Sequence, residues 1–316
     1  MSRFRIIIVS LWLVGFACVE TCPAGRIRAW GNNHYGQCDV PAGDDFVAVG
    51  AGWYHSLALR ADGSVMAWGS NDYGECDVPP GNDFVAIAGG FKFSVALKAD
   101  GSLAAWGSND YGRCDVPPGN DFVAIAAGGA HSVALKSDGS LVGWGAYNEV
   151  PPGNDFVAVA ATSGRSLGLR ADGTIVQFGS GIGIPVAGND FVDIAAGYDN
   201  GLALRSDGSL VAWGHCGEIP CEPYAPPGND FVAMAQGDGH ALALKSDGSL
   251  HAWPTDAGGP YYPAPPGNHF VAVACGMNHN LAIEVPEPSS TAALFSMVIV
   301  LLGSGWWRRT QLHAIG

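Results

Sequence analysis

Positive charge is scarce in this sequence. Its 316 residues include 15 Lys and Arg against 29 Asp and Glu, which gives a formal net charge of −14 and a pI near 4.8. Affinity for nucleic acid comes mostly from neutralisation of phosphates by Lys and Arg, so this chain would repel a polyanion. We therefore predict that the protein does not bind nucleic acid.

The usual catalytic and ligand-binding signatures are also missing. The chain has no Gly-x-Ser-x-Gly nucleophile elbow, no His-Glu-x-x-His pair and no phosphate-binding Gly loop. Carboxylates are numerous, but they recur in repeated Asp-Gly and Asn-Asp-Phe sequences, and the distal Glu of a calcium loop is missing. Because no carboxylate pair stands out from its copies, we predict a non-enzyme without a cofactor or a metal site.

No segment carries a helical period of useful length, whereas residues that favour turns are plentiful. The chain has 46 Gly and 20 Pro, and only 14% of its residues are charged. Gly and Pro interrupt helices and permit tight reversals, so this composition predicts many short strands joined by turns.

A Trp-Gly pair marks seven internal repeats. The fifth repeat has Phe instead of Trp, and the seventh has Pro instead of Gly. The spacings by subtraction are 38, 38, 38, 34, 35 and 40 residues, a period typical of solenoids, propellers and arrays. The marker residues are Trp30, Trp68, Trp106, Trp144, Phe178, Trp213 and Trp253.

Each unit contains three apolar segments that we predict to be strands, at 102–106, 122–127 and 132–136 in the third repeat. We expect a fourth short strand near 114–116. The Asp-Gly pair at 138–139 favours a tight hairpin turn with both central residues at positive φ. Four antiparallel strands repeated radially predict an all-β fold, a single seven-bladed β-propeller over residues 25–284, because a closed ring hides the sheet edges.

Four histidines share one place in the repeat, the fourth position of Gly-x-x-His. They could form a ring of metal ligands or be structural residues that bond loop carbonyls, one in each blade. Equivalent residues lie a full blade apart, too far to share one zinc ion, so we favour the structural interpretation. These residues are His55, His131, His240 and His279.

The cysteines divide in the same way. Cys38, Cys76 and Cys114 are equivalent residues of successive repeats, and we expect them to lie beyond disulfide reach of one another. Cys216 and Cys221 lie close together in the lengthened sixth repeat, and in an oxidising compartment they are the candidate disulfide.

The two residues inside Gly-x-x-His vary most between repeats, and several of them are aromatic. If these turns line one end of the ring, they form an aromatic patch of the kind that binds proteins or stacks on sugar rings. The alternative is that they cap the apolar wedge between blades. The long loops of the last two repeats give a second candidate surface. The candidate partner-binding residues are Trp53, Tyr54, Phe91, Tyr198, Tyr261 and Tyr262.

The unit resembles the regulator-of-chromosome-condensation repeat. The likeness rests on Gly-Ser-Leu-x-x-Trp-Gly within 207–214, on a downstream Tyr-Gly, and on Gly-x-x-His-Ser-x-Ala-Leu at 128–135. The eukaryotic namesake promotes nucleotide exchange on a nuclear GTPase and binds chromatin. The acidity of this chain, and the predicted export signals at its two ends, argue against both roles. Its short repeats look more like secreted relatives such as the propeller-type β-lactamase inhibitory protein, which implies protein binding.

The N-terminal residues have the features of an export signal. Arg3 and Arg5 precede an apolar run over 6–16 and then small residues, so we predict a signal peptide over residues 1–24. Cleavage after Ala17 or after Ala24 would fit, and lipidation of Cys18 is an alternative.

The C-terminal residues 285–316 form a predicted sorting tail. Pro286, Glu287 and Pro288 precede an apolar segment over 291–307, which is long enough to cross a bilayer, and Arg308 and Arg309 should stay cytoplasmic. This order resembles the PEP-CTERM tail. The resemblance implies transient insertion in the inner membrane, removal by an exosortase-type enzyme, and delivery to the cell surface or extracellular matrix. A permanent membrane anchor has the same hydropathy and is the alternative.

Together these features predict an exported bacterial protein whose propeller is a scaffold for an unknown protein or polysaccharide. A secreted enzyme inhibitor of the β-lactamase-inhibitory type and a polysaccharide-acting propeller enzyme are the alternatives.

Mass spectrometry of the protein from its native cells tests the tail. We expect a chain that ends near Pro288 and is found outside the inner membrane. An intact C-terminus retained in the inner membrane would instead identify a permanent anchor and contradict processing.

Overall fold

The computed structural model describes residues 23–179, 186–198, 200–214, 225–255 and 262–286. All of these except Pro286 belong to one compact unit, Met1–Val285. Over these ranges the only helical element is the short 3₁₀ turn η1 (Asp110–Gly112), and no helix has the length and apolar character needed to cross a membrane. The predicted signal sequence up to residue 22 and the predicted membrane segment 291–307 lie outside the described residues.

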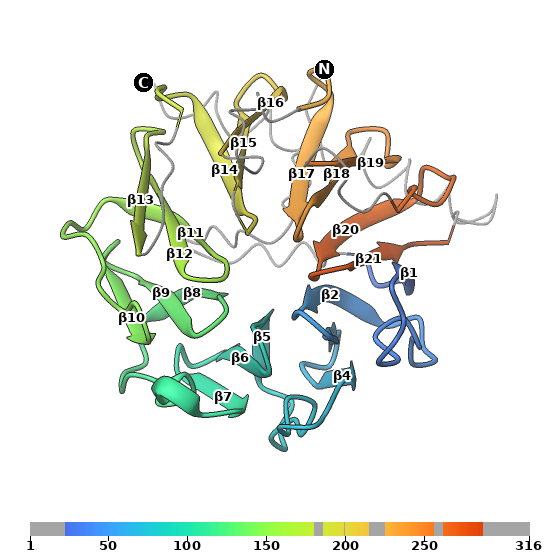
Figure 1. Ribbon diagram of the computed structural model, residues 1–316. Coiled ribbons are helices and arrows are strands. Elements are labelled where there is room, and N and C mark those ends of the chain that lie inside the picture. The colour runs from blue at the N-terminus through green and yellow to red at the C-terminus, as the bar shows by residue number, and fades with distance from the viewer. Residues whose placement is uncertain (1–22, 180–185, 199, 215–224, 256–261, 287–316) are drawn as a thin grey trace, which may run out of the picture. The chain divides into compact units, whose positions relative to one another are not determined.

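Seven antiparallel three-stranded sheets surround a central axis (Figure 1). We number them blades 1 to 7; blades 1 to 6 each contain three consecutive strands, and blade 7 contains the last two strands and the first. The strands are β1 (Arg26–Gly31), β2 (Phe46–Ala51), β3 (His55–Arg60), β4 (Val65–Gly69), β5 (Phe84–Gly89), β6 (Phe93–Lys98), β7 (Leu103–Gly107), β8 (Phe122–Ala127), β9 (His131–Lys136), β10 (Leu141–Gly145), β11 (Phe156–Ala161), β12 (Arg165–Arg170), β13 (Ile175–Gly179), β14 (Phe191–Ala196), β15 (Asn200–Arg205), β16 (Leu210–Gly214), β17 (Phe231–Gln236), β18 (His240–Lys245), β19 (Leu250–Pro254), β20 (Phe270–Cys275) and β21 (His279–Glu284).

Every blade packs on the next, and blade 7 packs on blade 1, so the ring is closed. The predicted all-β ring of seven blades is therefore confirmed. The sequence repeat, however, is offset from the blade by one strand. The Trp strand that begins each repeat is the outer strand of the preceding blade, as β7 is in blade 2. This offset leaves β1 to complete blade 7, where it pairs with β21 from Arg26↔Glu284 to Gly31↔His279.

The prediction of a fourth strand near 114–116 is wrong. The Asp115 amide donates to the Gly112 carbonyl at 3.1 Å, and the Val116 amide donates to the Cys114 carbonyl at 2.9 Å. Pro117 and Pro118 follow and have no amide to donate. Since local turns use the available N–H groups, this segment is a loop and each blade has three strands.

The hairpin turns also differ from the prediction. In blade 1 the Gly63 amide donates to the Arg60 carbonyl at 3.0 Å, and only Gly63 of the Asp-Gly pair has positive φ, at 82°. Asp62 instead accepts hydrogen bonds from the amide and the hydroxyl of Ser64, at 2.9 and 2.6 Å. These bonds hold the pKa of the exposed Asp62 carboxyl below its ordinary value. The Asp therefore acts through its side chain and does not need an unusual backbone conformation.

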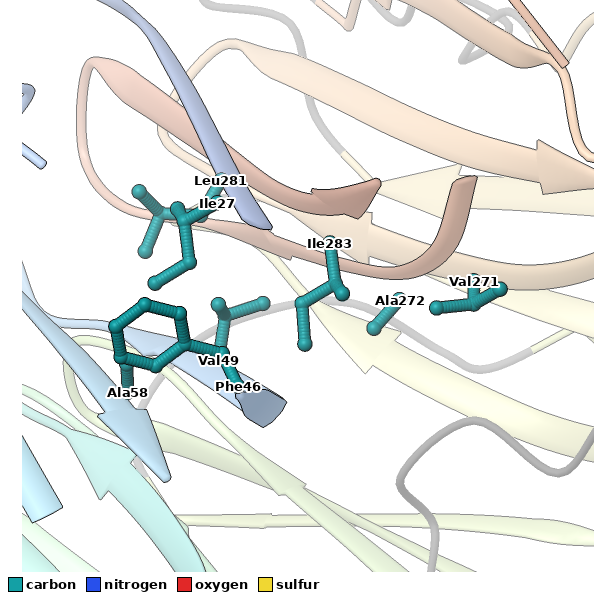
Figure 2. Packing of buried hydrophobic residues seen from close by; sticks show 8 residues of the cluster. All are labelled: Ile27, Phe46, Val49, Ala58, Val271, Ala272, Leu281 and Ile283. Carbon is teal, nitrogen blue, oxygen red and sulfur yellow. The ribbon is translucent and has the colours of Figure 1, made fainter. Parts of the chain in front are cut away.

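The core lies between blades rather than inside them. The middle strand of blade 1, β3, is buried from its first residue to its fifth, because both of its faces are covered. Figure 2 shows the cluster that joins blade 7 to blade 1, which includes Ile27, Phe46 and Ile283. Phe46 is fully buried, and burial of a side chain of this size stabilises a fold by roughly 1.5–3 kcal/mol.

A buried polar belt accompanies this core. The imidazole Nε2 of His279 lies 2.9 Å from the Ser56 hydroxyl in the next blade, and Nε2 of His55 lies 2.9 Å from that of Ser94. Each hydroxyl also lies close to a backbone carbonyl, 2.8 Å for Ser56 to Gln37 and 2.9 Å for Ser94 to Glu75. A hydroxyl donates only one proton, so it must accept from the imidazole. His55 and His279 therefore carry their proton on Nε2.

The same belt recurs in other blades with different partners. Nε2 of His131 lies 2.8 Å from the Ser166 hydroxyl, and Nε2 of His240 lies 3.1 Å from Oδ1 of Asn280. Blade 2 has Phe93 in the histidine position, and the hydroxyl of Ser132 in blade 3 has no hydrogen-bond partner in the part of the chain that the structure describes. The histidines thus hydrogen-bond side chains of the next blade, with His55, His240 and His279 as donors, which refines the expectation that they bond loop carbonyls.

Ser94 and Ser132 form a matched pair for testing the belt. Ser94→Ala removes a partner of both His55 and the Glu75 carbonyl, and we expect it to lower the free energy of unfolding by about 1–3 kcal/mol. Ser132→Ala removes a buried hydroxyl without a partner, and because such a group costs free energy in the folded state we expect no loss of stability or a small gain. Urea denaturation measures both. Equal losses would contradict the role given to the belt.

The belt also predicts acid sensitivity. Burial lowers the pKa of His55 to about 4, despite the opposing effect of Glu75, and burial also lowers the pKa of His131 to about 4. A lowered folded-state pKa means that the unfolded chain binds more protons below pH 6.5, so the histidines stabilise the fold above pH 6.5 and lose this effect as the pH falls towards 4. Each such histidine contributes on the order of 3 kcal/mol.

Urea midpoints measured from pH 7.5 to 4.5 test this expectation. His131→Asn, which copies Asn200 of blade 5, should be less stable at pH 7.5 and should lose less stability on acidification than the natural chain. An unchanged pH slope in this variant would show that His131 is not one of the groups responsible.

Candidate functional site

The turns between the inner and middle strands gather at one end of the ring. The Trp53 amide of blade 1 donates to the Gly90 carbonyl of blade 2 at 3.2 Å, and the Phe91 amide donates to the Gly128 carbonyl of blade 3 at the same distance. We call this end the turn face; it consists of the turns 52–54, 90–92, 128–130 and their counterparts, with the adjoining loops 32–37, 70–75, 108–113 and 146–149.

Close packing explains the glycine that opens each Gly-x-x-His turn. A Cβ on Gly52 would lie 2.1 Å from Cε1 of the His55 ring, and one on Gly276 would lie 2.1 Å from the same atom of His279. The imidazole that joins two blades therefore lies directly over its own turn. The two intervening residues differ between blades, and blade 1 has two aromatic side chains there. In blade 3 the first of them, Gly129, has no room for a side chain, because a Cβ would lie 2.7 Å from the Ser163 carbonyl oxygen.

A hollow of about 90 Å³ lies on the axis at this end and takes lining residues from all seven blades. Small residues such as Ala127 and Ala161 line one part of it, and larger side chains from blades 1 and 4 to 7 line another. The larger lining side chains are Trp53, Thr162, Tyr198, Gln236, Asp238, Cys275 and Met277.

Three of the predicted partner-binding residues meet beside this hollow. The ring centroid of Trp53 lies 4.6 Å from that of Phe91 and the centroid of Tyr54 lies 6.1 Å from it, so aromatic side chains of blades 1 and 2 touch across the blade boundary. All three are partly exposed. They therefore cover part of the wedge between blades and also present ring surface to solvent.

The other predicted residues are more scattered. Tyr198 lines the hollow and is 45% exposed. Tyr262 is partly buried, with its ring 5.4 Å from that of His240 and its carbonyl accepting from the Trp30 indole at 3.3 Å. Tyr261 and the predicted Cys216–Cys221 disulfide lie outside the described residues.

The sequence prediction missed four tyrosines on the turn face. Tyr35, Tyr73 and Tyr111 are 45%, 48% and 74% exposed, and Tyr147 is also exposed. The first three belong to the Tyr-Gly pairs that had been interpreted only as part of the repeat. A signal for them was present in the sequence: a large aromatic residue recurs at one loop position without an apolar neighbour. A buried residue would usually have apolar neighbours, so this pattern indicates an exposed ring.

Two of these tyrosines connect to the group formed by Trp53, Tyr54 and Phe91, one directly and one through Lys92. The Tyr35 centroid lies 5.0 Å from that of Tyr54, and Nζ of Lys92 lies 3.9 Å from the Tyr73 centroid and 4.8 Å from the Phe91 centroid. Tyr35, Trp53, Tyr54, Phe91, Tyr73 and Lys92 thus form one connected group, which we call the aromatic cluster.

Arg113 is a buried residue that holds the neighbouring loops of blades 2 and 3 together. It is 4% exposed, and its guanidinium donates to the carbonyls of Asp110 and Phe91 at 2.8 Å and to that of Gly129 at 3.3 Å. Because these acceptors belong to two turns and the loop between them, Arg113 joins blades 2 and 3 and is not available as an anion-binding residue.

The repeated cysteines are free thiols with structural partners. Each Sγ lies 3.1–3.4 Å from a carbonyl of its own loop, those of Asn32, Ser70 and Ser108. Burial raises the pKa of Cys38 to about 11 and that of Cys76 to about 12. Thiols of such high pKa are poor nucleophiles at neutral pH. Across the described ranges no three His, Cys, Asp or Glu side chains group together as a metal site would require.

Comparisons with known proteins agree with this geometry. The family described as Regulator of chromosome condensation (RCC1) repeat matches residues 46–75, 84–113, 122–149 and 191–215. No curated protein matches the chain.

Several solved structures have a similar fold. Prp20p from Saccharomyces cerevisiae, described with its binding to Gsp1p and histones, is 16% identical over 88% of this chain and 95% of its own, with a TM-score of 0.70. Human WBSCR16 is 17% identical over 84% and 100%, with a TM-score of 0.69. The ectodomain of the receptor kinase CR4 from Physcomitrella patens is 22% identical over 73% and 69%, with a TM-score of 0.59. At these identities the likeness concerns the fold alone, and the chain is an all-β protein whose RCC1-like repeats close into an RCC1-like β-propeller.

Proposed function

We propose that this protein is an exported bacterial surface or extracellular-matrix protein that binds a protein or a polysaccharide through its turn face. The observation that carries the proposal is the aromatic cluster, in which Trp53, Tyr54 and Phe91 from two blades meet at one end of the ring. Partly exposed aromatic side chains that support one another are the usual energetic centres of binding surfaces.

Backbone strain supports the same face. Within the described ranges only three residues other than glycine have positive φ, namely Lys92 at 65°, Tyr111 at 63° and Tyr147 at 54°. All three lie on the turn face. Such conformations cost on the order of 1–3 kcal/mol each and cluster where a protein holds side chains for binding. The opposite end of the ring, with its Asp-Gly turns, has no such residue among those that the structure describes.

The chemistry of the face favours binding over catalysis. The Cys38 and Cys76 thiols, which directly follow two of its loops, have raised pKa values. Arg113 donates to three backbone carbonyls and pairs with Asp110, and Lys92 lies over two aromatic rings. A similar ring in Prp20p is described as binding other proteins, so the fold is compatible with a platform role.

Export rests on the sequence. The basic and apolar N-terminal residues support secretion, and Pro286 to Pro288 with the apolar segment and Arg308–Arg309 supports processing by an exosortase-type enzyme. Surface or matrix delivery would place the turn face where extracellular proteins and polysaccharides are the available partners.

Retention on extracellular matrix isolated from the native cells tests the binding function. We expect labelled full-length protein in mild detergent to sediment with the matrix, and Trp53→Ala/Tyr54→Ala to weaken retention by roughly tenfold or more, because two central aromatic contacts are lost. The matched control is Val85→Ala/Val192→Ala, which truncates two exposed apolar side chains at the start of β5 and β14, at the other end of the ring. Equal retention of both double variants, with both folded by circular dichroism, would remove the turn face from consideration.

A further inference from the structure

The tyrosine-bearing loops of the turn face repeat with the blades. Tyr35, Tyr73 and Tyr111 occupy the same position in the loops that join blade 7 to 1, blade 1 to 2 and blade 2 to 3. Each is followed by a glycine at positive φ, between 72° and 80°. The turn face therefore presents one exposed ring at each of three successive blade boundaries.

Each loop is closed by the same side-chain bonds. Nδ2 of Asn71 donates to Oδ1 of Asp77 at 2.9 Å, and Oδ1 of Asn71 accepts from the Cys76 amide at 2.8 Å. The loops of Tyr35 and Tyr111 have the same two bonds, with lengths of 2.7 to 2.9 Å. The Tyr73 amide also donates to Oε2 of the buried Glu75 at 2.8 Å. The backbone that carries each ring is thus held in place before any ligand binds.

A neighbouring side chain lies against each ring. Tyr54 lies 5.0 Å from Tyr35, Nζ of Lys92 lies 3.9 Å from Tyr73, and the guanidinium carbon of Arg113 lies 5.7 Å from Tyr111. These contacts restrict the rings, which lowers the entropy lost when a flat partner stacks on them.

The charges beside the rings select the kind of ligand. Asp72 and Asp110, the residues before Tyr73 and Tyr111, are both exposed, and the protein as a whole carries a net charge of −14. Oδ2 of Asp110 accepts from the Ser108 hydroxyl at 2.9 Å and lies 3.9 Å from the Arg113 guanidinium, which leaves Oδ1 for a ligand. The nearby cations Lys92 and Arg113 already contact aromatic rings and, for Arg113, backbone carbonyls. A polymer with carboxylate, sulfate or phosphate groups would be repelled, whereas carboxylates accept hydrogen bonds from sugar hydroxyls.

From this arrangement we infer that Tyr35, Tyr73 and Tyr111 are successive stacking subsites for a neutral polysaccharide chain. The inference rests on the proposed binding function and specifies its ligand. Each of three blade boundaries presents one restrained aromatic ring next to a polar residue. Such a periodic surface fits a polymer built from repeating sugar units. A protein partner would instead favour an apolar centre depleted of charge, whereas the aromatic cluster includes Lys92, exposed Asp72 and Asp110 lie beside the rings, and Tyr111 is not part of the cluster.

Affinity electrophoresis of the full-length protein in mild detergent tests this inference. Because the protein is strongly acidic it migrates in native gels, and gels that contain dextran, laminarin or glucomannan are compared with gels that contain alginate. We expect at least one neutral polysaccharide to retard the protein and alginate not to. We also expect affinity for oligosaccharides of the retarding polymer to rise with their length, since longer chains reach more subsites.

Variants separate stacking from folding. Tyr73→Ala/Tyr111→Ala should lower the affinity for the retarding polysaccharide about tenfold or more, whereas Tyr73→Phe/Tyr111→Phe, which keeps both rings, should retain most of it. Retardation by alginate alone, or equal affinities of the Ala and natural chains, would overturn the inference. Matrix retention that depends on Trp53 and Tyr54 without retardation by any neutral polysaccharide would overturn it too, but would leave the proposed binding function standing. Failure of both assays would remove both proposals.

Discussion

The middle strand of each blade is covered on both faces, and the rest of the ring follows from this coverage. In β3 the first five residues are buried, and they remain so only while blades 7 and 2 flank blade 1. A ring with a gap would expose one such face to water, so closure is required for stability. Strand β1 achieves it through six residues that pair with β21 and bring Ile27 into the core. The ion pair of Arg28 with Glu284 on the same strands is exposed and adds little, about 0–1 kcal/mol.

The same packing between blades distinguishes residues that stabilise the propeller from residues whose side chains can vary. The histidine of Gly-x-x-His bonds the next blade, and the glycine must lie under its ring, so both have a packing role. The two residues between them contribute mainly backbone bonds, as the Trp53 amide does to Gly90. Blade 1 carries Trp53 and Tyr54 there, and blade 3 carries Gly129 and Ala130 in the same fold. Variation at this face is broad but not unlimited, since a Cβ on Gly129 would lie 2.7 Å from the Ser163 carbonyl oxygen.

Sequence reasoning recovered what depends on burial and repetition. The period of the Trp-Gly marker predicted seven blades, and the predicted strands match β7, β8 and β9 closely. It failed where local hydrogen bonding decided the outcome. Val116 had the β-branched side chain of a strand residue, but its amide bonds the Cys114 carbonyl. The offset of the repeat from the blade was also beyond reach, because the pairing of β1 with β21 joins residues more than 240 positions apart. The aromatic residues of the turns were found because they vary between repeats, whereas Tyr35, Tyr73 and Tyr111 were missed because they do not.

Those three tyrosines show that repetition has two different causes. A repeated residue such as Phe46, Phe84 or Phe122 is buried, so the packing between blades requires it. Tyr35, Tyr73 and Tyr111 are between 45% and 74% exposed, and their loops are closed by the Asn, Asp and Cys bonds whatever side chain stands at the tip. Packing therefore does not account for their repetition. The ligand that we infer would account for it, because it would meet successive blades in the same way. Of the three tyrosines only Tyr111 has a strained backbone, with φ at 63°, and it is also the most exposed, at 74%.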